Sequence, residues 1–395
     1  MWSYSVIILS WWEIIFKTLR HHEGLIYITS GNIVGAALTG IFWLVLAAVQ
    51  NVIDYGQINY IIAIGSLAGS IALLGLNTTV TTLLPRGNGS ISIQANQIIL
   101  ISGTICAVLA SLFNWMLFLF VLGMAFWMMT SYELLGKKAY RKYALNIIGA
   151  RGSQLLLSLV LFHYFGLPGI IIGFVISFFL FSRGFYSSIP MFGRRFHEIR
   201  THFKTSLHLY SYNLSNAFLL YFDKLVIAPV FGYATLGYYQ LGFQFLMFFS
   251  MIPVSFYQYL IPEEAIGKKR NKLRWYGITL SIILTILLFA SSPVIIKFFF
   301  PNYTASISSM RILSLGIIPM MAISTLNSRF LSLHKTPYIM VGSLVYQSLQ
   351  IVLMLYLGNR LGILGISLAV VVALTVQALV LFCLNFRLTG SNQRN

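Results

Sequence analysis

The sequence predicts an all-α integral membrane protein with about twelve transmembrane helices, and three observations support this prediction. First, 58% of the 395 residues are apolar and only 9% are charged, whereas about 25% of the residues in an average soluble domain are charged. Second, the mean hydropathy is +0.83, so the chain cannot cover a globule with polar side chains. Third, the apolar residues gather in segments close to the roughly 20 residues that span a bilayer as a helix. This composition excludes a soluble enzyme, a disordered protein and a disulfide-rich secreted domain.

The first 23 residues form a region of their own. An apolar stretch, about 12 residues long and too short to span a bilayer comfortably, is followed by Glu13, Lys17 and Arg20. Tryptophans in this region suit the headgroup level of a membrane, so we expect a cytoplasmic amphipathic helix that lies in the interface. Two alternatives stay open. One is a signal peptide, which normally carries its positive charges before the apolar part, and the other is a thirteenth span.

Twelve apolar segments follow this region, and each is predicted to cross the membrane as a helix. Few long stretches alternate polar and apolar residues in the way that the strands of a membrane β-barrel do. The approximate limits of the segments are 24–49, 59–84, 95–112, 115–135, 143–163, 167–186, 206–230, 237–261, 275–297, 306–328, 338–357 and 362–386.

The basic residues predict the orientation of these segments. If the N-terminus is cytoplasmic, 21 of the 26 Lys and Arg residues fall in cytoplasmic loops or at cytoplasmic ends of spans, and only Lys297 and Arg360 fall on the opposite side. Cytoplasmic loops of membrane proteins carry an excess of Lys and Arg. We therefore expect a multi-pass protein of the cytoplasmic membrane with both termini cytoplasmic. The net charge of +18 then reflects topology, and we expect no nucleic-acid partner.

The longest basic loop lies near the middle of the chain and predicts a division into two lobes. Its Arg, His and Lys residues alternate with phenylalanines, which is typical of a linker that lies on anionic headgroups. The predicted regions are a cytoplasmic interfacial segment at 1–23, an N-terminal six-helix lobe at 24–186, a basic cytoplasmic linker at 187–205, a C-terminal six-helix lobe at 206–386 and a cytoplasmic tail at 387–395.

A weak internal repeat supports the two lobes. Residues 30–56 share nine identities with residues 211–237 at a constant offset of 181, and Gly56 is among them, matching Gly237. In addition, a G-x-x-G motif opens the last helix of each predicted lobe, at 166–169 and at 362–365. With six spans in each lobe, the two halves would have the same orientation and be related by an axis along the membrane normal.

The sequence contains no recognisable catalytic or metal-binding motif, so we predict no enzyme, no cofactor and no metal site. Ionisable residues inside spans are functional candidates because burying them in lipid is costly. Arg151, Asp223, Lys224 and Arg311 are the four that we single out. Because adjacent helical residues point about 100° apart, we expect Asp223 and Lys224 not to share one direction. We also expect Glu133, near an inner span end, to pair with Lys137 at i+4.

Each candidate also has a structural interpretation. Asp223 and Lys224 could form lobe-fixing ion pairs, or Lys224 could extend towards the outer headgroups. Arg151 lines the inner mouth of a cavity or reaches the cytoplasmic headgroups, and Arg311 either binds substrate or anchors the outer end of its span. A cavity lined by Arg and Lys suits an anionic substrate, since both side chains bind phosphate. With only eight carboxylates in the chain, a cavity for cationic drugs is harder to build.

Several short motifs, in order along the chain, resemble those of polysaccharide exporters. The chain is similar in this way to the multidrug/oligosaccharidyl-lipid/polysaccharide (MOP) flippase superfamily, on its polysaccharide-transporter branch, which includes O-antigen flippases. The motifs are DYG at 54–56, GLN at 75–77, YFDKLVI at 221–227, TLGYY at 235–239, PNY at 301–303 and MRIL at 310–313. The chain lacks the two additional helices of lipid II flippases, which argues against that branch.

The resemblance implies a function and roles for the site residues. It implies two six-helix bundles around a central cavity that move a polyprenyl-diphosphate-linked oligosaccharide to the outer leaflet by alternating access. Asp223 matches the acid of the family's seventh span and is expected to couple an ion, whereas Arg311 matches the base of its tenth span. Arg151, Lys224 and Arg311 are then the expected substrate-binding residues. Expected partners are the lipid-linked anionic glycan, membrane lipids and a glycan polymerase or glycosyltransferases.

Two other functions stay open from the sequence. A cation-coupled multidrug exporter of the same fold would need acids in the cavity, and only Asp223 lies deep in a span. A membrane-embedded polymerase or glycosyltransferase would normally need large outer loops or an acidic metal-binding loop, whereas the predicted outer loops are all short.

Overall fold

The computed structural model describes a chain of helices arranged in two compact units. The described residues are 23–87, 89–191, 193, 199, 203–265, 271–333 and 335–391, and they contain no strand. Unit 1 comprises Met1–Phe42 and Ala68–Asn213, and unit 2 comprises Trp43–Leu67 and Leu214–Asn395. The unit boundaries therefore fall inside three helices, and each unit is considered by itself. The interfacial segment up to residue 22, most of the linker and the last four residues lie outside the described residues.

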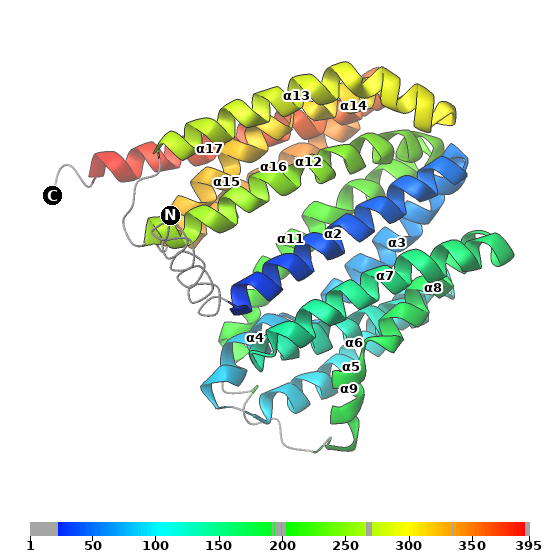
Figure 1. Ribbon diagram of the computed structural model, residues 1–395, viewed down its shortest axis with the longest axis vertical. Coiled ribbons are helices and arrows are strands. Elements are labelled where there is room, and N and C mark those ends of the chain that lie inside the picture. Colours follow the sequence, from blue (N-terminus) through cyan, green and yellow to red (C-terminus); the bar gives the residue numbers. More distant parts are fainter. Residues whose placement is uncertain are drawn as a thin grey trace, which may run out of the picture. The chain divides into compact units, whose positions relative to one another are not determined.

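Unit 1 contains the helices up to the middle of the chain (Figure 1). They are α2 (Glu23–Val49), α3 (Val52–Ala72), α4 (Leu76–Leu83), η1 (Leu84–Arg86), α5 (Ile91–Ser111), α6 (Leu117–Gly136), α7 (Tyr140–Phe165), α8 (Leu167–Leu180), α9 (Arg183–Ser188) and η2 (Ile189–Met191), with α2 and α3 shared with unit 2. A buried apolar cluster joins α4, α5, α6 and α9 and includes the stacked rings of Phe126 and Phe185. This cluster gives unit 1 a core of its own.

Unit 2 contains the second half of the chain. Its helices are α11 (Phe203–Phe231, shared with unit 1), α12 (Tyr233–Ala265), α13 (Asn271–Phe299), η3 (Pro301–Tyr303), α14 (Ser306–Ser314), α15 (Ile317–Ser332), α16 (Thr336–Leu361) and α17 (Ile363–Ser391). Helices α16 and α17 pack along each other, as do α12 and α15. The Ser309 and Ser367 hydroxyls, buried at 2.7 Å from each other, join α14 to α17.

The predicted all-α membrane fold is confirmed. In the described part of the chain, eight helices are long and apolar enough to cross a membrane, and two bent helix pairs raise the number to ten if each pair is one span. The pairs are α3 with α4–η1 and α8 with α9–η2, each bent by 48°. The other two predicted spans coincide with α11 and α12, which have 29 and 33 residues. Twelve crossings, and the lobe limits 24–186 and 206–386, stay predictions.

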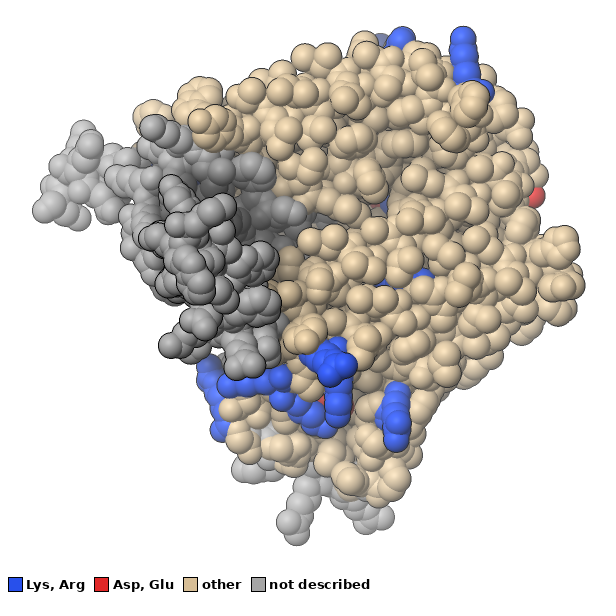
Figure 2. Space-filling view, in the orientation of Figure 1, with Lys and Arg blue, Asp and Glu red and all other residues tan. Residues whose placement is uncertain are grey.

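Much of the surface is apolar, as expected for a protein embedded in a lipid bilayer. Large apolar side chains such as Leu112, Trp115 and Phe298 are more than 70% exposed. Figure 2 shows broad tan areas on which Lys, Arg, Asp and Glu are sparse. Exposing such apolar side chains to water costs free energy, whereas contact with the hydrocarbon core of a bilayer does not.

The two G-x-x-G motifs have the same geometry in the two units. Gly166 and Gly362 precede α8 and α17 with φ of 62° and 59°, a left-handed region that favours glycine. Three residues on, a Cβ at Gly169 would overlap the backbone carbonyl of Leu161, and a Cβ at Gly365 would overlap that of Leu357. In each unit the glycine thus lets the last helix of the predicted lobe approach the preceding helix closely.

Candidate functional site

The structure joins the side chains of the predicted pair Asp223 and Lys224 on α11. The Lys224 Nζ lies 2.9 Å from the Asp223 Oδ1 and donates to the backbone carbonyl of Leu220 at 2.8 Å. The expectation that the two side chains would not share one direction is therefore wrong. The flexible stem of lysine carries the ammonium group back to its neighbour. The pair is buried, with 4% of Asp223 and 6% of Lys224 exposed.

Helix α12 completes the surroundings of the pair. The Tyr239 hydroxyl donates to the Asp223 Oδ2 at 3.0 Å, so both carboxylate oxygens accept hydrogen bonds. The Lys224 Nζ lies 4.8 Å from the centre of the Phe243 ring, which is one helical turn beyond Tyr239. Buried charges are tolerated where they are paired and hydrogen-bonded. Helices α11 and α12 thus hold an ion pair with no net charge among apolar residues.

A cavity of about 110 Å³ lies beside Asp223, between residues of α11 and α16. It is lined by Phe218, Phe222, Asp223, Gln347, Gln350, Ile351 and Met354. Gln350 is only 5% exposed, and its Nε2 has no hydrogen-bond partner in the described part of the chain. A buried donor without a partner costs free energy. Gln350 thus contributes a buried N–H donor with no partner among the described residues, on the face of α16 that lines the cavity with Asp223.

Arg151 lies in unit 1, on α7. Its Nη1 donates to the Gln154 Oε1 at 2.9 Å, and its Cζ lies 4.8 Å from the centre of the Trp127 ring on α6. A Cβ at Gly35 of α2 would lie 3.6 Å from the Arg151 Cγ. Arg151 is half-buried and packs among three helices of unit 1.

Arg311 lies on α14 in unit 2. Its Cζ is 5.2 Å from the centre of the Phe289 ring on α13, and its buried Nε has no hydrogen-bond partner among the described residues. The ion pairs given by the described residues do not include one between Arg311 and Asp223. Among the described residues, Arg311 is therefore held by an aromatic contact and not by an ion pair with Asp223.

The three predicted substrate-binding cations share one feature that the sequence did not reveal. Each lies over an aromatic ring, at 4.8 Å for Arg151 and Lys224 and at 5.2 Å for Arg311. A cation–π contact stabilises a partly desolvated cation without cancelling its charge. The rings thus leave the positive charges of Arg151 and Arg311 in place, whereas the charge of Lys224 is balanced by Asp223. Their predicted roles in binding, and that of Asp223 in ion coupling, stay predictions.

Four residues of the site were not predicted from the sequence. Tyr239 and Phe243 contact the pair from α12, and Gln347 and Gln350 line the cavity from α16. Tyr239 belongs to the TLGYY motif, although nothing in the motif assigns it a partner. The glutamines do carry a usable signal, since an amide in an otherwise apolar span must find a partner in the protein.

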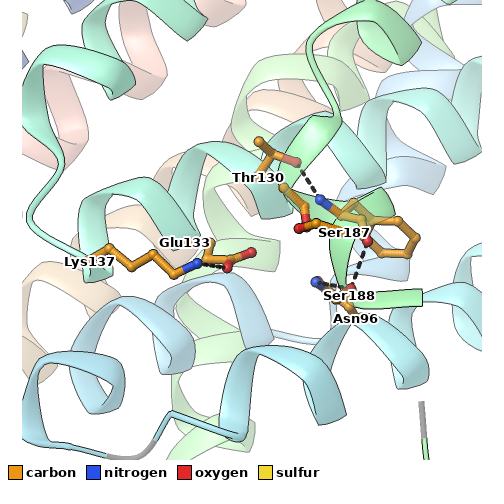
Figure 3. Close-up of polar contacts among 8 residues, drawn as sticks. Asn96, Thr130, Glu133, Lys137, Ser187 and Ser188 are labelled. Atoms are coloured by element: carbon orange, nitrogen blue, oxygen red, sulfur yellow. Dashed lines mark hydrogen bonds and ion pairs between the residues drawn. The ribbon is translucent and has the colours of Figure 1, made fainter. Parts of the chain in front are cut away.

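A second buried acid lies in unit 1, where Figure 3 shows its surroundings. Glu133 on α6 forms the predicted ion pair with Lys137. The neighbouring Thr130 accepts a hydrogen bond from the backbone N–H of Phe185 at 3.1 Å, and this contact fastens the short helix α9 to α6. The remaining titratable groups of the described residues include no cluster of three or more His, Cys, Asp or Glu side chains that could hold a metal ion.

Comparison with known proteins gives structural neighbours and no sequence relatives. No protein-family model matches the chain, and no curated protein matches it. Among solved structures, the lipid II flippase MurJ in an inward closed conformation is similar, with a TM-score of 0.67 and 16% identity, over 91% of this chain and 87% of the other. A mutant MATE protein is similar with a TM-score of 0.63 and 13% sequence identity, over 94% of this chain and 97% of the other. An outward-facing MATE multidrug resistance transporter of the MOP superfamily is similar with a TM-score of 0.60 and 12% sequence identity, over 94% of this chain and 96% of the other.

The chain has the fold of the MOP transporters. All three neighbours are membrane transporters, and each match covers at least 87% of both chains. The predicted resemblance is thus confirmed at the level of the superfamily fold, and the chain is a multi-pass membrane protein. The polysaccharide-transporter branch, which the sequence motifs favour, stays a prediction. The MOP fold occurs both in a lipid II flippase and in multidrug exporters, so the substrate has to be argued from the residues of this chain.

Proposed function

We propose that this protein is a flippase that moves a polyprenyl-diphosphate-linked oligosaccharide across the cytoplasmic membrane by alternating access. It would bind the lipid-linked precursor on the cytoplasmic side and release it on the outer side, with both termini cytoplasmic. A glycan polymerase or glycosyltransferases would act on the same glycan, and the protein itself would catalyse no covalent step. The MOP fold and the lipid II flippase among its neighbours support a transporter of this class.

One observation supports an anionic substrate above all. Arg151, Lys224 and Arg311 lie within the membrane-spanning helices, and each is held over an aromatic ring. A cation is expensive to place there, and the aromatic contact leaves the charges of Arg151 and Arg311 in place, while Asp223 balances that of Lys224. Arginine binds phosphate bidentately and lysine binds it as a point charge. A diphosphate is the group of such a lipid that these side chains would recognise.

The flipping of a labelled lipid tests this proposal directly. The full chain would be reconstituted in liposomes with a fluorescent polyprenyl-diphosphate oligosaccharide, and its transfer between leaflets would be followed by quenching from outside. We expect transfer with the wild type and a loss of about tenfold or more for Arg151→Gln, Lys224→Gln and Arg311→Gln, since a hydrogen bond to a charged group is worth about 1.5–3 kcal/mol.

Arg360→Gln is the matched control for this assay. Arg360 also lies over an aromatic ring, 5.0 Å from the centre of Tyr356, but it is exposed near the end of α16. We expect this variant to transfer lipid like the wild type. If Arg151, Lys224 and Arg311 variants all did the same, the cationic substrate site would be refuted.

A cation-coupled multidrug exporter is the second candidate function. The MATE neighbours have this fold, and the cavity beside Asp223 is lined mainly by aromatic and aliphatic side chains, which suit an apolar cation. Drug-efflux measurements in a susceptible host distinguish the two functions. An exporter would lower intracellular drug concentration and lose this activity in Asp223→Asn, whereas a flippase would leave drug accumulation unchanged in both.

A further inference from the structure

Exposed cations gather at the end of unit 1 where α6 is followed by α7. Three segments meet there, since a Cβ at Gly136, the last residue of α6, would lie 3.1 Å from the Leu84 side chain of η1, and a Cβ at Gly184 of α9 would lie 3.5 Å from the Glu133 Oε2. Figure 2 shows Lys and Arg side chains gathered where α4 and the start of α7 lie in Figure 1. We call the six exposed cations of these segments the basic end: Arg86, Lys137, Lys138, Arg141, Lys142 and Arg183.

Most of this charge is not balanced within the described part of the chain. Glu133 is the only acid of unit 1 whose side chain the structure describes, and it is buried and paired with Lys137. The ion pairs of the described residues include none with the other five cations of the basic end. Because like charges on one surface repel each other, this arrangement favours an anionic partner.

Helix stability does not explain these cations. The turn between α6 and α7 is a Schellman motif, in which the backbone N–H groups of Lys138 and Ala139 bond to carbonyls of the last turn of α6. Lys138 has a φ of 56°, at a position where glycine is the usual residue and a side chain costs free energy. Arg141 and Lys142 lie in the first turn of α7, where the helix dipole disfavours positive charge. The charges thus lie where the fold alone would favour other residues.

Exposed apolar side chains beside the cations indicate a lipid as the partner. Leu145, one turn beyond Arg141 on α7, is 60% exposed, and Leu180, three residues before Arg183 at the end of α8, is 63% exposed. An anionic phospholipid has both matching parts, because its headgroup is attracted to Lys and Arg and its acyl chains contact apolar side chains. A soluble acidic protein would match the cations alone.

We propose that the basic end binds the headgroup phosphate of anionic phospholipids. This goes beyond the proposed function, since it concerns a lipid of the bilayer and not the lipid that is transported. In the proposed topology the basic end faces the cytoplasmic leaflet, whose surface is negatively charged. Lys138, Arg141 and Lys142 form the centre of the site, while Lys137 remains paired with Glu133. A bound headgroup offsets the repulsion among the cations and so stabilises unit 1.

Thermal unfolding of the full chain in neutral detergent micelles, with and without added lipid, tests this proposal. Phosphatidylglycerol should raise the midpoint more than phosphatidylcholine, whose headgroup has no net charge, and the gain should shrink at high salt. Native mass spectrometry of the same samples gives the lipid affinity. The triple variant Lys138→Gln/Arg141→Gln/Lys142→Gln should bind phosphatidylglycerol at least tenfold more weakly, since each cation near a membrane surface strengthens binding about fivefold.

The matched control is Lys297→Gln/Lys335→Gln/Arg360→Gln. It also removes three exposed cations, but they lie in unit 2, where Lys335 and Arg360 are at opposite ends of α16. This control should bind phosphatidylglycerol like the wild type.

Lys138→Gly separates the charge from the turn. Because glycine is favoured at a φ of 56°, this variant should unfold at a higher temperature than the wild type in neutral detergent. It should nevertheless gain less from phosphatidylglycerol, whereas Lys138→Arg should gain as much as the wild type.

Several outcomes would overturn the inference. These are equal phosphatidylglycerol affinity in the wild type and the triple variant, an equal loss in the control, or an equal gain from phosphatidylcholine. Polyglutamate and inorganic pyrophosphate replace the lipid in two further samples, and a gain as large as that from phosphatidylglycerol would assign the surface to an acidic protein or to free phosphate and refute the lipid. If the triple variant does not fold, an unchanged gain in Lys138→Gly refutes the role of the charge. Lipid flipping is measured separately, so the proposed function can stand where this inference fails.

Discussion

Tyr239 holds the Asp223 carboxylate in place, and removing its hydroxyl tests how much this contact contributes. The hydroxyl is fully buried and donates at 3.0 Å to a charged acceptor, and hydrogen bonds of this kind contribute about 1.5–3 kcal/mol. We predict that Tyr239→Phe lowers the midpoint of thermal unfolding in detergent micelles. It should also loosen the Asp223–Lys224 pair, because Oδ2 would lose its donor.

Tyr143→Phe is the control for this substitution. Tyr143 is also buried and also donates to a side chain, the Asn32 Oδ1 at 2.9 Å, but its acceptor is neutral. A neutral hydrogen bond contributes about 0.5–1.5 kcal/mol, so the control should shift the midpoint less. Equal shifts for the two variants would mean that the charge of Asp223 adds nothing to its contact with Tyr239.

The sequence identified the charged residues of the site but not what surrounds them. Asp223 and Lys224 stand out because ionisable residues are rare inside spans, and this made them predictable. Tyr239 and Gln350 belong to other helices, and only the packing of α11 with its neighbours brings them to the pair. The 100° angle between adjacent helical residues also gave a wrong expectation for Lys224. This angle describes the direction of the Cβ atom, whereas the ammonium group lies at the end of a flexible four-carbon side chain.

At the scale of helices, the second glycine of each G-x-x-G motif controls how closely two helices pack. A Cβ at Gly169 or Gly365 would overlap the backbone of the preceding helix, and backbone cannot move aside as a side chain can. We predict that Gly169→Ala and Gly365→Ala each destabilise the protein by about 1–3 kcal/mol, the usual cost of overpacking. Thermal unfolding in micelles measures the effect.

Gly152→Ala provides the comparison. Gly152 lies inside α7, and a Cβ there would meet only the Leu38 side chain at 3.9 Å, which is ordinary contact. Alanine favours a helix over glycine by about 1 kcal/mol, so this variant should be as stable as the wild type or more stable. Destabilisation by Gly152→Ala equal to that by Gly169→Ala would refute the role of the close backbone contact.

The helices themselves were well predicted, and their breaks were not. Each predicted apolar segment coincides with a helix, with a bent pair or, at 306–328, with the consecutive helices α14 and α15, because a span must satisfy its backbone hydrogen bonds internally. The 48° bend between α3 and α4 lies inside an apolar stretch, so hydropathy does not mark it, whereas the bend between α8 and α9 falls at the polar residues Ser182 and Arg183. Gly75, at φ 72° before α4, is the residue by which the first bend could have been suspected.

At the scale of the molecule, composition was enough for the fold class, but it did not predict how the helices gather into units. Residues 43–67 lie within the predicted N-terminal lobe by sequence, but they belong to unit 2. The reason is visible where α3 crosses α12. A Cβ at Gly56 would overlap the carbonyl of Tyr233, and a Cβ at Gly237 would overlap that of Val52. Val52 and Tyr233 are themselves matched at the offset of 181, so equivalent residues of the repeat contact each other reciprocally.

Because of this reciprocal contact, we predict that the effects of substituting Gly56 and Gly237 on stability are not additive. Gly56→Ala or Gly237→Ala alone must push α3 and α12 apart, and each should destabilise the protein by about 1–3 kcal/mol. Once the helices have separated, the second methyl group finds space, so the double variant should cost clearly less than the sum, as residues in contact generally couple. Gly169→Ala combined with Gly365→Ala is the control, because each of these glycines packs within its own unit and their effects should add. Additive effects at Gly56 and Gly237, measured by the same unfolding experiment, would show that the two glycines do not share one crossing.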